Sequence, residues 1–291
     1  MRKAQLAHYE NTRAQFEDFA ADGWANHKMT IYWMLNSQWP SFFGNIIDYY
    51  LSPGGTYYGA KKGLRPLSVV FNSYATGDHS QARIIVVNQT PSEVQGLRVR
   101  VRVYDLDGKV RDDRSADGIQ VHYNGAAQVM LLPRYPQSSP VFFVRCQLFD
   151  RSGKLVVDNT YWQSQKDDDL GDRKNDSGMH LQQVSWADMT ALNTMPSVNV
   201  EVSALQSTVD NQKHVTIRLY NPSEHIAFFE RATISAARDG DEILPIEYDD
   251  NYVTMYPEET TEIDGTVSSA PGAHWVKLEG YNTAAISVPI K

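Results

Sequence analysis

The chain has 291 residues, of which 42% are hydrophobic, and its mean hydropathy is −0.45. Its formal net charge is −8, with a pI near 5.5, and its lysines and arginines do not cluster. An acidic chain without a basic patch lacks the attraction that drives binding to nucleic acids and anionic membranes, so we expect neither partner.

The length exceeds what one hydrophobic core usually supports and predicts two or three domains. Apolar residues recur at helical spacing between Leu6 and Ala20, which predicts a helix over residues 1–20 that Gly23 ends. Residues 29–36, MTIYWMLN, form a nearly continuous apolar run. Such a run is typical of a strand that is covered on both faces in a parallel sheet.

A second helix is predicted over residues 56–65, ending before Pro66. From residue 67 the pattern becomes antiparallel β. Residues 97–104, LRVRVRVY, alternate apolar and arginine side chains and run into the turn DLDG. About seven strands fit between Leu67 and Trp162, as in an immunoglobulin-like sandwich.

The polar stretch 163–178 is the clearest linker, and a second series of strands follows it. In both halves a strand closes on an asparagine, Asn88 or Asn221, with a proline soon after. This likeness predicts two related sandwiches, although a shared solution to the same turn would also produce it. The expected domains are residues 1–65, a sandwich over 66–165, a linker over 166–178 and a second sandwich over 179–291.

The single cysteine, Cys146, lies in the apolar run VFFVRCQLF and is expected to be a buried, unreactive thiol. No apolar stretch is long enough to span a membrane, and the first residues lack the apolar centre of a secretion signal. The histidines show no metal-binding spacing, and no nucleotide or dinucleotide fingerprint occurs. The acidic run DDDLGD resembles part of a calcium loop but lacks its closing glutamate. We therefore expect no metal and no cofactor.

Two tryptophans stand close to the end of the predicted strand at residues 29–36. Trp33 has two interpretations, either a core residue or a sugar-stacking platform at the mouth of an α/β barrel. Asn36 at the strand end and Trp39 in the next loop favour the sugar platform.

Hydrolysis of a glycoside requires two facing carboxyl groups, about 5 to 5.5 Å apart for the retaining route. The acidic residues near the tryptophans lie on or just after the first helix, except for Asp48, which has no partner. They are Glu10, Glu17, Asp18, Asp22 and Asp48. We therefore predict no catalytic residue in this chain.

The stretch IYWMLNSQWPSFFGNIIDYYLSPGGTYYGAKKGLRPL resembles the eighth strand, loop and last helix of the barrel in glycoside hydrolase family 2, in its exo-β-D-glucosaminidase and β-mannosidase-like branch. The preceding RKAQLAHYENTRAQFEDF resembles the helix between barrel strands seven and eight. The stretches AFFERATIS, LPIEYDDNYVTMYPEETTEI and VKLEGYN resemble the final β-domain of that branch.

The resemblance implies a mainly β chain in which two immunoglobulin-like sandwiches follow the C-terminal remnant of a (β/α)8 barrel. It implies that the two catalytic carboxylates of the family precede Met1, so the chain alone would be inactive. Trp33 and Asn36 match positions that line the subsite for the non-reducing sugar, and Trp39 and Asp48 lie near the same mouth. The substrate implied is a β-linked glucosamine or mannose oligosaccharide, and an intact member would be secreted or periplasmic.

A further set of candidate binding residues lies in EYDDN, which the resemblance assigns to the last domain. Its carboxylates would suit the ammonium group of an aminosugar if this turn reached the barrel mouth. The alternative is an ordinary polar hairpin turn. The residues concerned are Tyr248, Asp249, Asp250 and Asn251.

Two other functions stay open at this point. The chain could be a non-catalytic module that binds carbohydrate or protein, or a stand-alone structural protein. A lone barrel strand with two helices cannot close a barrel, so its apolar faces need another surface. We expect residues 1–65 either to pack onto the first sandwich or to associate with a second copy.

Overall fold

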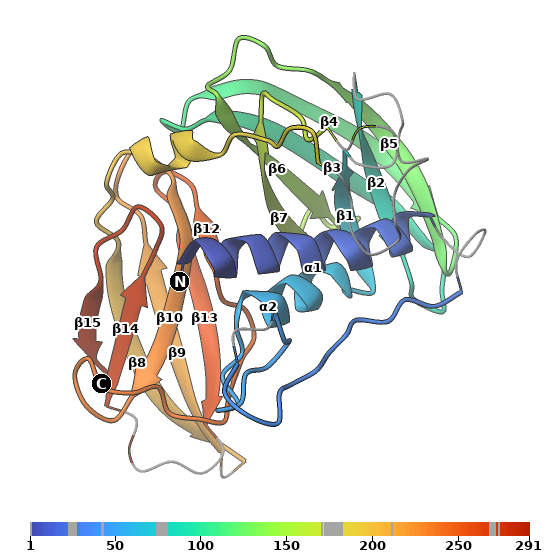
Figure 1. Ribbon diagram of the computed structural model, residues 1–291. Helices are drawn as coiled ribbons and strands as arrows, with labels where there is room; N and C mark the ends of the chain where they lie inside the picture. The colour runs from blue at the N-terminus through green and yellow to red at the C-terminus, as the bar shows by residue number, and fades with distance from the viewer. Residues whose placement is uncertain are drawn as a thin grey trace.

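The computed structural model describes residues 2–22, 28–41, 44–73, 81–169, 171, 183–210, 212–267, 272 and 274–291. The chain is mainly β, with two β-sandwiches that meet along a junction occupied by two helices (Figure 1). Neither of the helices described is long and apolar enough to cross a membrane.

The first sandwich has seven antiparallel strands, the number that the sequence pattern predicts. They are β1 (Leu67–Asn72), β2 (Gln81–Asn88), β3 (Val94–Asp105), β4 (Val110–Val121), β5 (Gly125–Pro133), β6 (Val141–Phe149) and β7 (Leu155–Ser164). One sheet has the order β1-β2-β5 and the other β4-β3-β6-β7. Along β3 the valines are buried between the sheets, while the arginines alternate with them on the opposite face.

Strand β6 is not half-buried in the way that β3 is. Both of its faces are covered, so Arg145 and Gln147 are buried along with the apolar residues of the strand. Cys146 is fully buried with a free thiol, as expected. One face of β6 contacts the other sheet of its own sandwich, and the opposite face contacts the second sandwich, which the local sequence cannot indicate.

The second sandwich repeats the strand order of the first, with one added edge strand. Its sheets have the orders β11-β13-β9-β8 and β12-β10-β14-β15. The strands are β8 (Glu201–Val209), β9 (Gln212–Tyr220), β10 (Ala227–Ser235), β11 (Ile246–Tyr248), β12 (Val253–Met255), β13 (Thr260–Val267), β14 (Trp275–Glu279) and β15 (Ile286–Pro289). A short 3-10 helix, Thr190–Thr194, precedes them.

The two asparagines singled out from the sequence occupy equivalent places. The Asn88 amide donates to the carbonyls of Val121 and His122, at 3.2 and 3.0 Å, and Asn221 donates to those of Met255 and Tyr256, at 3.3 and 3.2 Å. Each asparagine also accepts from the backbone and hydroxyl groups two residues later and donates to the carbonyl four residues later. Together with the shared strand order, this supports two related sandwiches.

Helices α1 (Arg2–Asp22) and α2 (Gly55–Gly63) confirm the two predicted helices. They pack closely because α2 presents a glycine every fourth residue. A Cβ added at Gly55 or Gly59 would collide with the backbone carbonyl oxygen of Gln5 or Tyr9. A β-carbon at any of these glycines would push the two helices apart.

Helix α1 contacts both sandwiches. Near its C-terminal end Ala20 packs on Val70 and Ile85 of the first sandwich. Nearer the N-terminus, the Tyr9 ring lies 6.1 Å from Trp162 of β7 and 5.4 Å from Phe229 of β10. The expectation that residues 1–65 pack onto the first sandwich is therefore met by α1, but it was too narrow, because the helix packs onto the second sandwich as well.

The junction between the sandwiches is apolar and also contains a buried arginine. Arg145 of β6 donates to Asp158 of β7 from Nε at 2.9 Å and pairs with Glu259 of the second sandwich. Its guanidinium lies over the Tyr256 ring, 4.4 Å from the centroid. These contacts join one sandwich to the other through a single side chain.

The strand predicted over residues 29–36 is wrong. This segment is irregular, and its larger apolar side chains are exposed. A buried parallel strand needs hydrogen-bonded neighbours and helices on both faces. Among the residues that the structure describes, no parallel sheet is present for this segment to join. The predicted linker lies mostly outside the described residues.

Candidate functional site

Residues 28–41 and 44–54, named here the aromatic loop, connect α1 to α2. Figure 1 shows this loop as the blue trace that passes outside the two helices before it enters α2. Its start is fixed to α1, because the Gln15 amide donates to the Thr30 hydroxyl at 3.1 Å and to the Ile31 carbonyl at 3.2 Å. The four residues that the sequence nominates for sugar contact all lie on this loop: Trp33, Asn36, Trp39 and Asp48.

The loop folds back on itself beside these residues. The backbone N–H of Ile46 donates to the Met34 carbonyl at 3.3 Å, and that of Ile47 donates to the Leu35 carbonyl at 2.9 Å. This pairing brings the segment that carries Trp33 and Asn36 next to the segment that leads into Asp48, so residues separated by a dozen positions share one face of the molecule.

Both tryptophans of the loop are exposed. Trp33 has 76% of its surface accessible and Trp39 has 65%, and Asn36 is also exposed. The interpretation of Trp33 as a core residue is therefore wrong for this chain. An indole in this setting is free to stack on a ring.

The exposed indole belongs to a row of large apolar side chains. Met29, Ile31, Trp33 and Leu35 are each at least 60% exposed, while the residues between them are partly covered. This alternation is the pattern of an extended segment that is covered on one side only. A monomeric protein seldom exposes so many large apolar groups together, so the row marks a binding or packing surface.

Asp48 organises the tight turn at the end of the loop. Its Oδ1 accepts hydrogen bonds from the backbone N–H groups of Tyr50 and Ser52, both at 2.9 Å. The Ser52 hydroxyl in turn donates to Glu242 of the second sandwich at 3.1 Å. The turn is therefore attached to the C-terminal half of the molecule.

Two of the EYDDN residues are parts of the core. The Tyr248 hydroxyl accepts from the Ile234 backbone N–H at 2.9 Å, and the Asn251 amide makes two backbone hydrogen bonds with Ala232, at 2.8 and 2.9 Å. Both side chains are buried. In this structure they hold strand β10 in place, and neither has a free polar atom to offer a sugar from that position.

The two aspartates of EYDDN also make contacts within the chain. Asp249 accepts from the backbone N–H groups of Asp250 and Asp264 at 2.7 and 2.8 Å, which closes the turn. Asp250 pairs with Lys62 of α2, and Arg65 lies 3.7 Å away. These contacts dock α2 on the second sandwich, and among the described hydrogen bonds and ion pairs neither aspartate reaches the aromatic loop.

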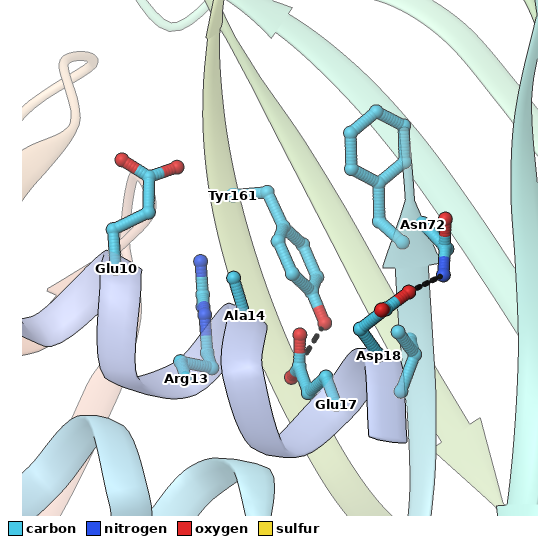
Figure 2. Close-up of a pocket in the computed structure, with 9 residues that line it drawn as sticks. Glu10, Arg13, Ala14, Glu17, Asp18, Asn72 and Tyr161 are labelled. Atoms are coloured by element: carbon cyan, nitrogen blue, oxygen red, sulfur yellow. Dashed lines mark hydrogen bonds between the residues drawn. The ribbon is translucent and has the colours of Figure 1, made fainter. Parts of the chain in front are cut away.

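A small hollow lies where α1 crosses the first sandwich. Figure 2 shows Glu17 and Asp18 of α1 pointing toward Tyr161 of β7 and Asn72 of β1. The Tyr161 hydroxyl donates to Glu17 at 2.9 Å, and the Asn72 amide donates to Asp18 at 3.1 Å. Its internal volume is about 10 Å³, room for one water molecule at most and far too small for a pyranose.

The hollow contains an unusual pair of buried charged groups that sequence reasoning did not single out. Arg13 donates to the Thr160 carbonyl at 2.6 Å, and its guanidinium lies 4.0 Å from the centroid of the Tyr161 ring. Burial raises the pKa of Glu17 to about 7, against the opposing effects of Arg13 and of the Tyr161 hydrogen bond. In the sequence, the signal that could have indicated this pair is the spacing of Arg13 and Glu17, which are four residues apart on the buried face of the helix.

Glu230 of β10 is a second buried carboxyl group. Burial raises its pKa to about 7, while a hydrogen bond from the Thr283 hydroxyl at 2.6 Å opposes the shift. It packs against Gly280 in the interior, away from any opening. Within the described ranges, no group of three or more potential ligands could hold a metal ion.

Comparison with known domain families assigns both sandwiches. Residues 179–283 match the exo-beta-D-glucosaminidase Ig-fold domain, and residues 80–166 match the mannosidase Ig/CBM-like domain. The immunoglobulin-like architecture expected from the strand pattern is therefore supported by fold and by sequence.

Relatives extend the similarity over nearly the entire chain. An exo-β-D-glucosaminidase of Streptomyces avermitilis is 36% identical over 99% of this chain, and that of Amycolatopsis orientalis is 33% identical over 99%. The crystal structure of Amycolatopsis orientalis exo-chitosanase CsxA superimposes with a TM-score of 0.90 at 32% identity, covering 99% of this chain and 34% of that enzyme. A further structure of CsxA is a complex with PNP-β-D-glucosamine.

These similarities define the chain first as a pair of immunoglobulin-like glycosidase domains with associated helices. More particularly, the chain belongs to the exo-β-D-glucosaminidase branch of glycoside hydrolase family 2. It corresponds to the C-terminal part of CsxA. It spans 32% and 28% of the length of the Streptomyces and Amycolatopsis relatives.

Proposed function

We propose that this chain acts as the C-terminal part of a retaining exo-β-D-glucosaminidase, in which the aromatic loop forms one wall of the sugar pocket. The catalytic carboxyl pair comes from a part of the enzyme outside these 291 residues. The substrate is a β-linked glucosamine oligosaccharide. A β-mannoside is the alternative substrate, since the first sandwich matches a mannosidase domain.

The observation that carries this proposal is the exposed aromatic loop on a firmly packed base. Trp33 and Trp39 present indole faces that suit stacking on a pyranose ring. Asn36 supplies an amide for the sugar hydroxyls, and Asp48 supplies a carboxylate for hydroxyl or ammonium groups. Homology to exo-β-D-glucosaminidases over 99% of the chain supports the assignment to an aminosugar.

The apolar row on the aromatic loop supports the existence of a missing neighbour. Ile31 and Leu35 flank Trp33 on the same exposed side, where they contribute nothing to sugar binding. Their burial against a preceding strand or helix would be favourable by about 25 cal/mol per Å² of apolar surface. We take Ile31 and Leu35 as the part of this row that packs against the rest of a (β/α)8 barrel, and Trp33 as the part that faces the sugar.

The arrangement of these carboxyl groups supports the expectation that the isolated chain is inactive. A retaining glycosidase needs an acid/base and a nucleophile about 5 to 5.5 Å apart across an open sugar site. Glu17 lies in a hollow too small for a sugar, and Glu230 lies in the interior. Asp48 is exposed, and its Oδ1 accepts two backbone hydrogen bonds within its own turn.

The proposal is tested with PNP-β-D-glucosamine and two proteins, the 291-residue chain and the polypeptide translated from the same gene together with its upstream sequence. We expect hydrolysis only by the longer protein. Trp33→Ala in the longer protein should raise KM about tenfold or more, if stacking of the sugar on the indole is comparable to that of a base on an aromatic side chain, which is worth about 1–3 kcal/mol. Robust hydrolysis by the 291-residue chain, abolished by a point change within it, would overturn the proposal.

A second candidate function is carbohydrate binding without catalysis. The observation that favours it is the exposure of both indoles in the chain by itself. It predicts saturable binding of chitosan oligosaccharides by the 291-residue chain, measured by calorimetry and lost in Trp33→Ala. Self-association through residues 1–65 would instead appear as a concentration-dependent mass in analytical ultracentrifugation that is reversed by Ile31→Asp.

A further inference from the structure

Glu242 lies in the segment between β10 and β11 of the second sandwich. Its backbone is fixed to β10, because Ser235 and Glu242 form an antiparallel bridge and the Ile243 N–H donates to the Ile234 carbonyl at 2.8 Å. Its side chain is only 13% exposed. A glutamate held in this way has little freedom to move its carboxylate.

The carboxylate of Glu242 joins two parts of the molecule through one oxygen. Its Oε2 accepts from Arg231 of β10 at 2.8 Å and from the Ser52 hydroxyl of the aromatic loop at 3.1 Å. Burial raises the pKa of Glu242, and the Arg231 charge and the Ser52 hydrogen bond oppose that shift. The arginine therefore orients a carboxylate that also accepts a hydrogen bond from a residue 190 positions earlier in the chain. A side-chain hydrogen bond with Tyr248 adds to its fixation and likewise opposes the rise in its pKa.

Ser52 links Glu242 to the Asp48 turn. Its backbone N–H donates to Asp48 Oδ1 at 2.9 Å, and its carbonyl accepts from the Asp48 N–H at 3.2 Å. Its hydroxyl is the only part of the residue that points to the second sandwich in the described contacts. The position of the turn is therefore determined from both sides, by its own backbone and by Glu242.

We infer that Glu242 is a positioning residue, which fixes the Asp48 turn through Ser52 and thereby sets the affinity of the adjacent site for an aminosugar. The sugar part of this inference rests on the function proposed above, whereas the positioning part concerns only contacts within this chain. The C-terminal sandwich is then more than a spacer, because one of its side chains determines where a substrate-contacting carboxylate lies.

The positioning part is tested in the 291-residue chain by hydrogen exchange. Ser52→Ala removes the hydrogen bond and leaves the Arg231–Glu242 ion pair intact, while Glu242→Ala removes the acceptor. In both variants we expect the amides of Tyr50 and Ser52 to exchange about three- to tenfold faster, the effect of one hydrogen bond. Glu247→Ala, at an exposed glutamate of the same region, is the control and should leave both rates unchanged.

The sugar part is tested in the longer polypeptide with PNP-β-D-glucosamine. Both variants should raise KM about three- to tenfold and leave kcat within about twofold, because the hydrogen bond positions a binding group. The double variant should be no worse than the more severe single variant, since both act through one contact. A general loss of stability would lower the amount of active protein and would not change KM.

The two experiments distinguish the positioning role of Glu242 from its effect on sugar affinity. Unchanged exchange at Tyr50 and Ser52 overturns the inference, as does an additive double variant. Faster exchange with an unchanged KM overturns the link to sugar affinity. If the unsubstituted longer protein hydrolyses no glucosaminide, the proposed function fails, and the exchange experiment still supports or overturns the positioning role of Glu242.

Discussion

Neutralising Glu17 should remove part of the pH dependence of stability. This carboxyl group is 3% exposed, and its pKa is about 7 in the folded chain against 4.5 for an unperturbed glutamate. The folded state therefore binds more protons than the unfolded state between these values. Its stabilising effect is fully present below pH 4.5 and is lost as the pH rises through 7.

The magnitude follows from the two pKa values. With 4.5 unfolded and about 7 folded, raising the pH from 5 to 8 lowers the free energy of unfolding by about 2–3 kcal/mol through Glu17 alone. Glu230 has the same folded pKa of about 7 and contributes a similar loss at a distant site. The unsubstituted chain should therefore be about 5 kcal/mol less stable at pH 8 than at pH 5 through these two groups.

Glu17→Gln keeps the shape of the protonated acid and an oxygen that accepts from Tyr161, but it cannot ionise. We expect it to halve the loss of stability between pH 5 and 8, and Glu17→Gln combined with Glu230→Gln to abolish most of it. The measurement is urea unfolding of the 291-residue chain at both pH values, followed by circular dichroism. Glu201→Gln, exposed on β8, is the matched control and should keep the full dependence.

A Glu17→Gln chain that loses as much stability between pH 5 and 8 as the unsubstituted chain would refute the reasoning. It would mean that Glu17 stays ionised in the folded state, stabilised by Arg13 more strongly than burial opposes it. An increase in the pH dependence would refute it equally, because the sign of the shift would then be reversed.

Three further predictions concern packing. Gly59→Ala should destabilise the chain by about 1–3 kcal/mol in urea unfolding, although alanine is usually the better helix former, because its Cβ would collide with the Tyr9 carbonyl. Asn221→Ala should cost about 2–4 kcal/mol, since it leaves buried backbone groups without partners. Arg145→Met should cost about 3 kcal/mol and speed proteolysis between the sandwiches, because it leaves Asp158 and Glu259 without their shared cation.

The sequence predicted the elements whose pattern is local. Alternation along residues 97–104 indicated a half-buried strand, and apolar spacing between Leu6 and Ala20 indicated a helix, and both are present. The asparagine motif of the two halves pointed to related sandwiches, and the equivalent hydrogen bonds and the shared strand order support that expectation. Strand β13, by contrast, has a weak local pattern, since TTEIDGTV contains few apolar residues.

The failed prediction concerns a segment whose structure depends on distant parts of the protein. Residues 29–36 have the composition of a buried parallel strand, and a strand of that kind forms only beside other strands. The docking contacts of α2 could not be predicted from the sequence either. In the pair between Lys62 and Asp250, for example, the partners are separated by 188 residues. Charge alone did not show which aspartate would hold a helix and which would face a ligand.

The absence of a strand over residues 29–36 and the exposure of the candidate site have the same physical cause. The aromatic loop carries large apolar side chains that the described residues leave exposed, among them Ile31, Trp33 and Leu35. The parts that hold them, α1, α2 and the Ser52–Glu242 contact, are by contrast well packed and hydrogen-bonded within the chain. A firm base beneath an unsatisfied apolar face is the arrangement expected of one wall of a pocket whose other walls come from elsewhere. Under the function proposed above, a barrel would supply those other walls, and Trp33 would stay open to the sugar.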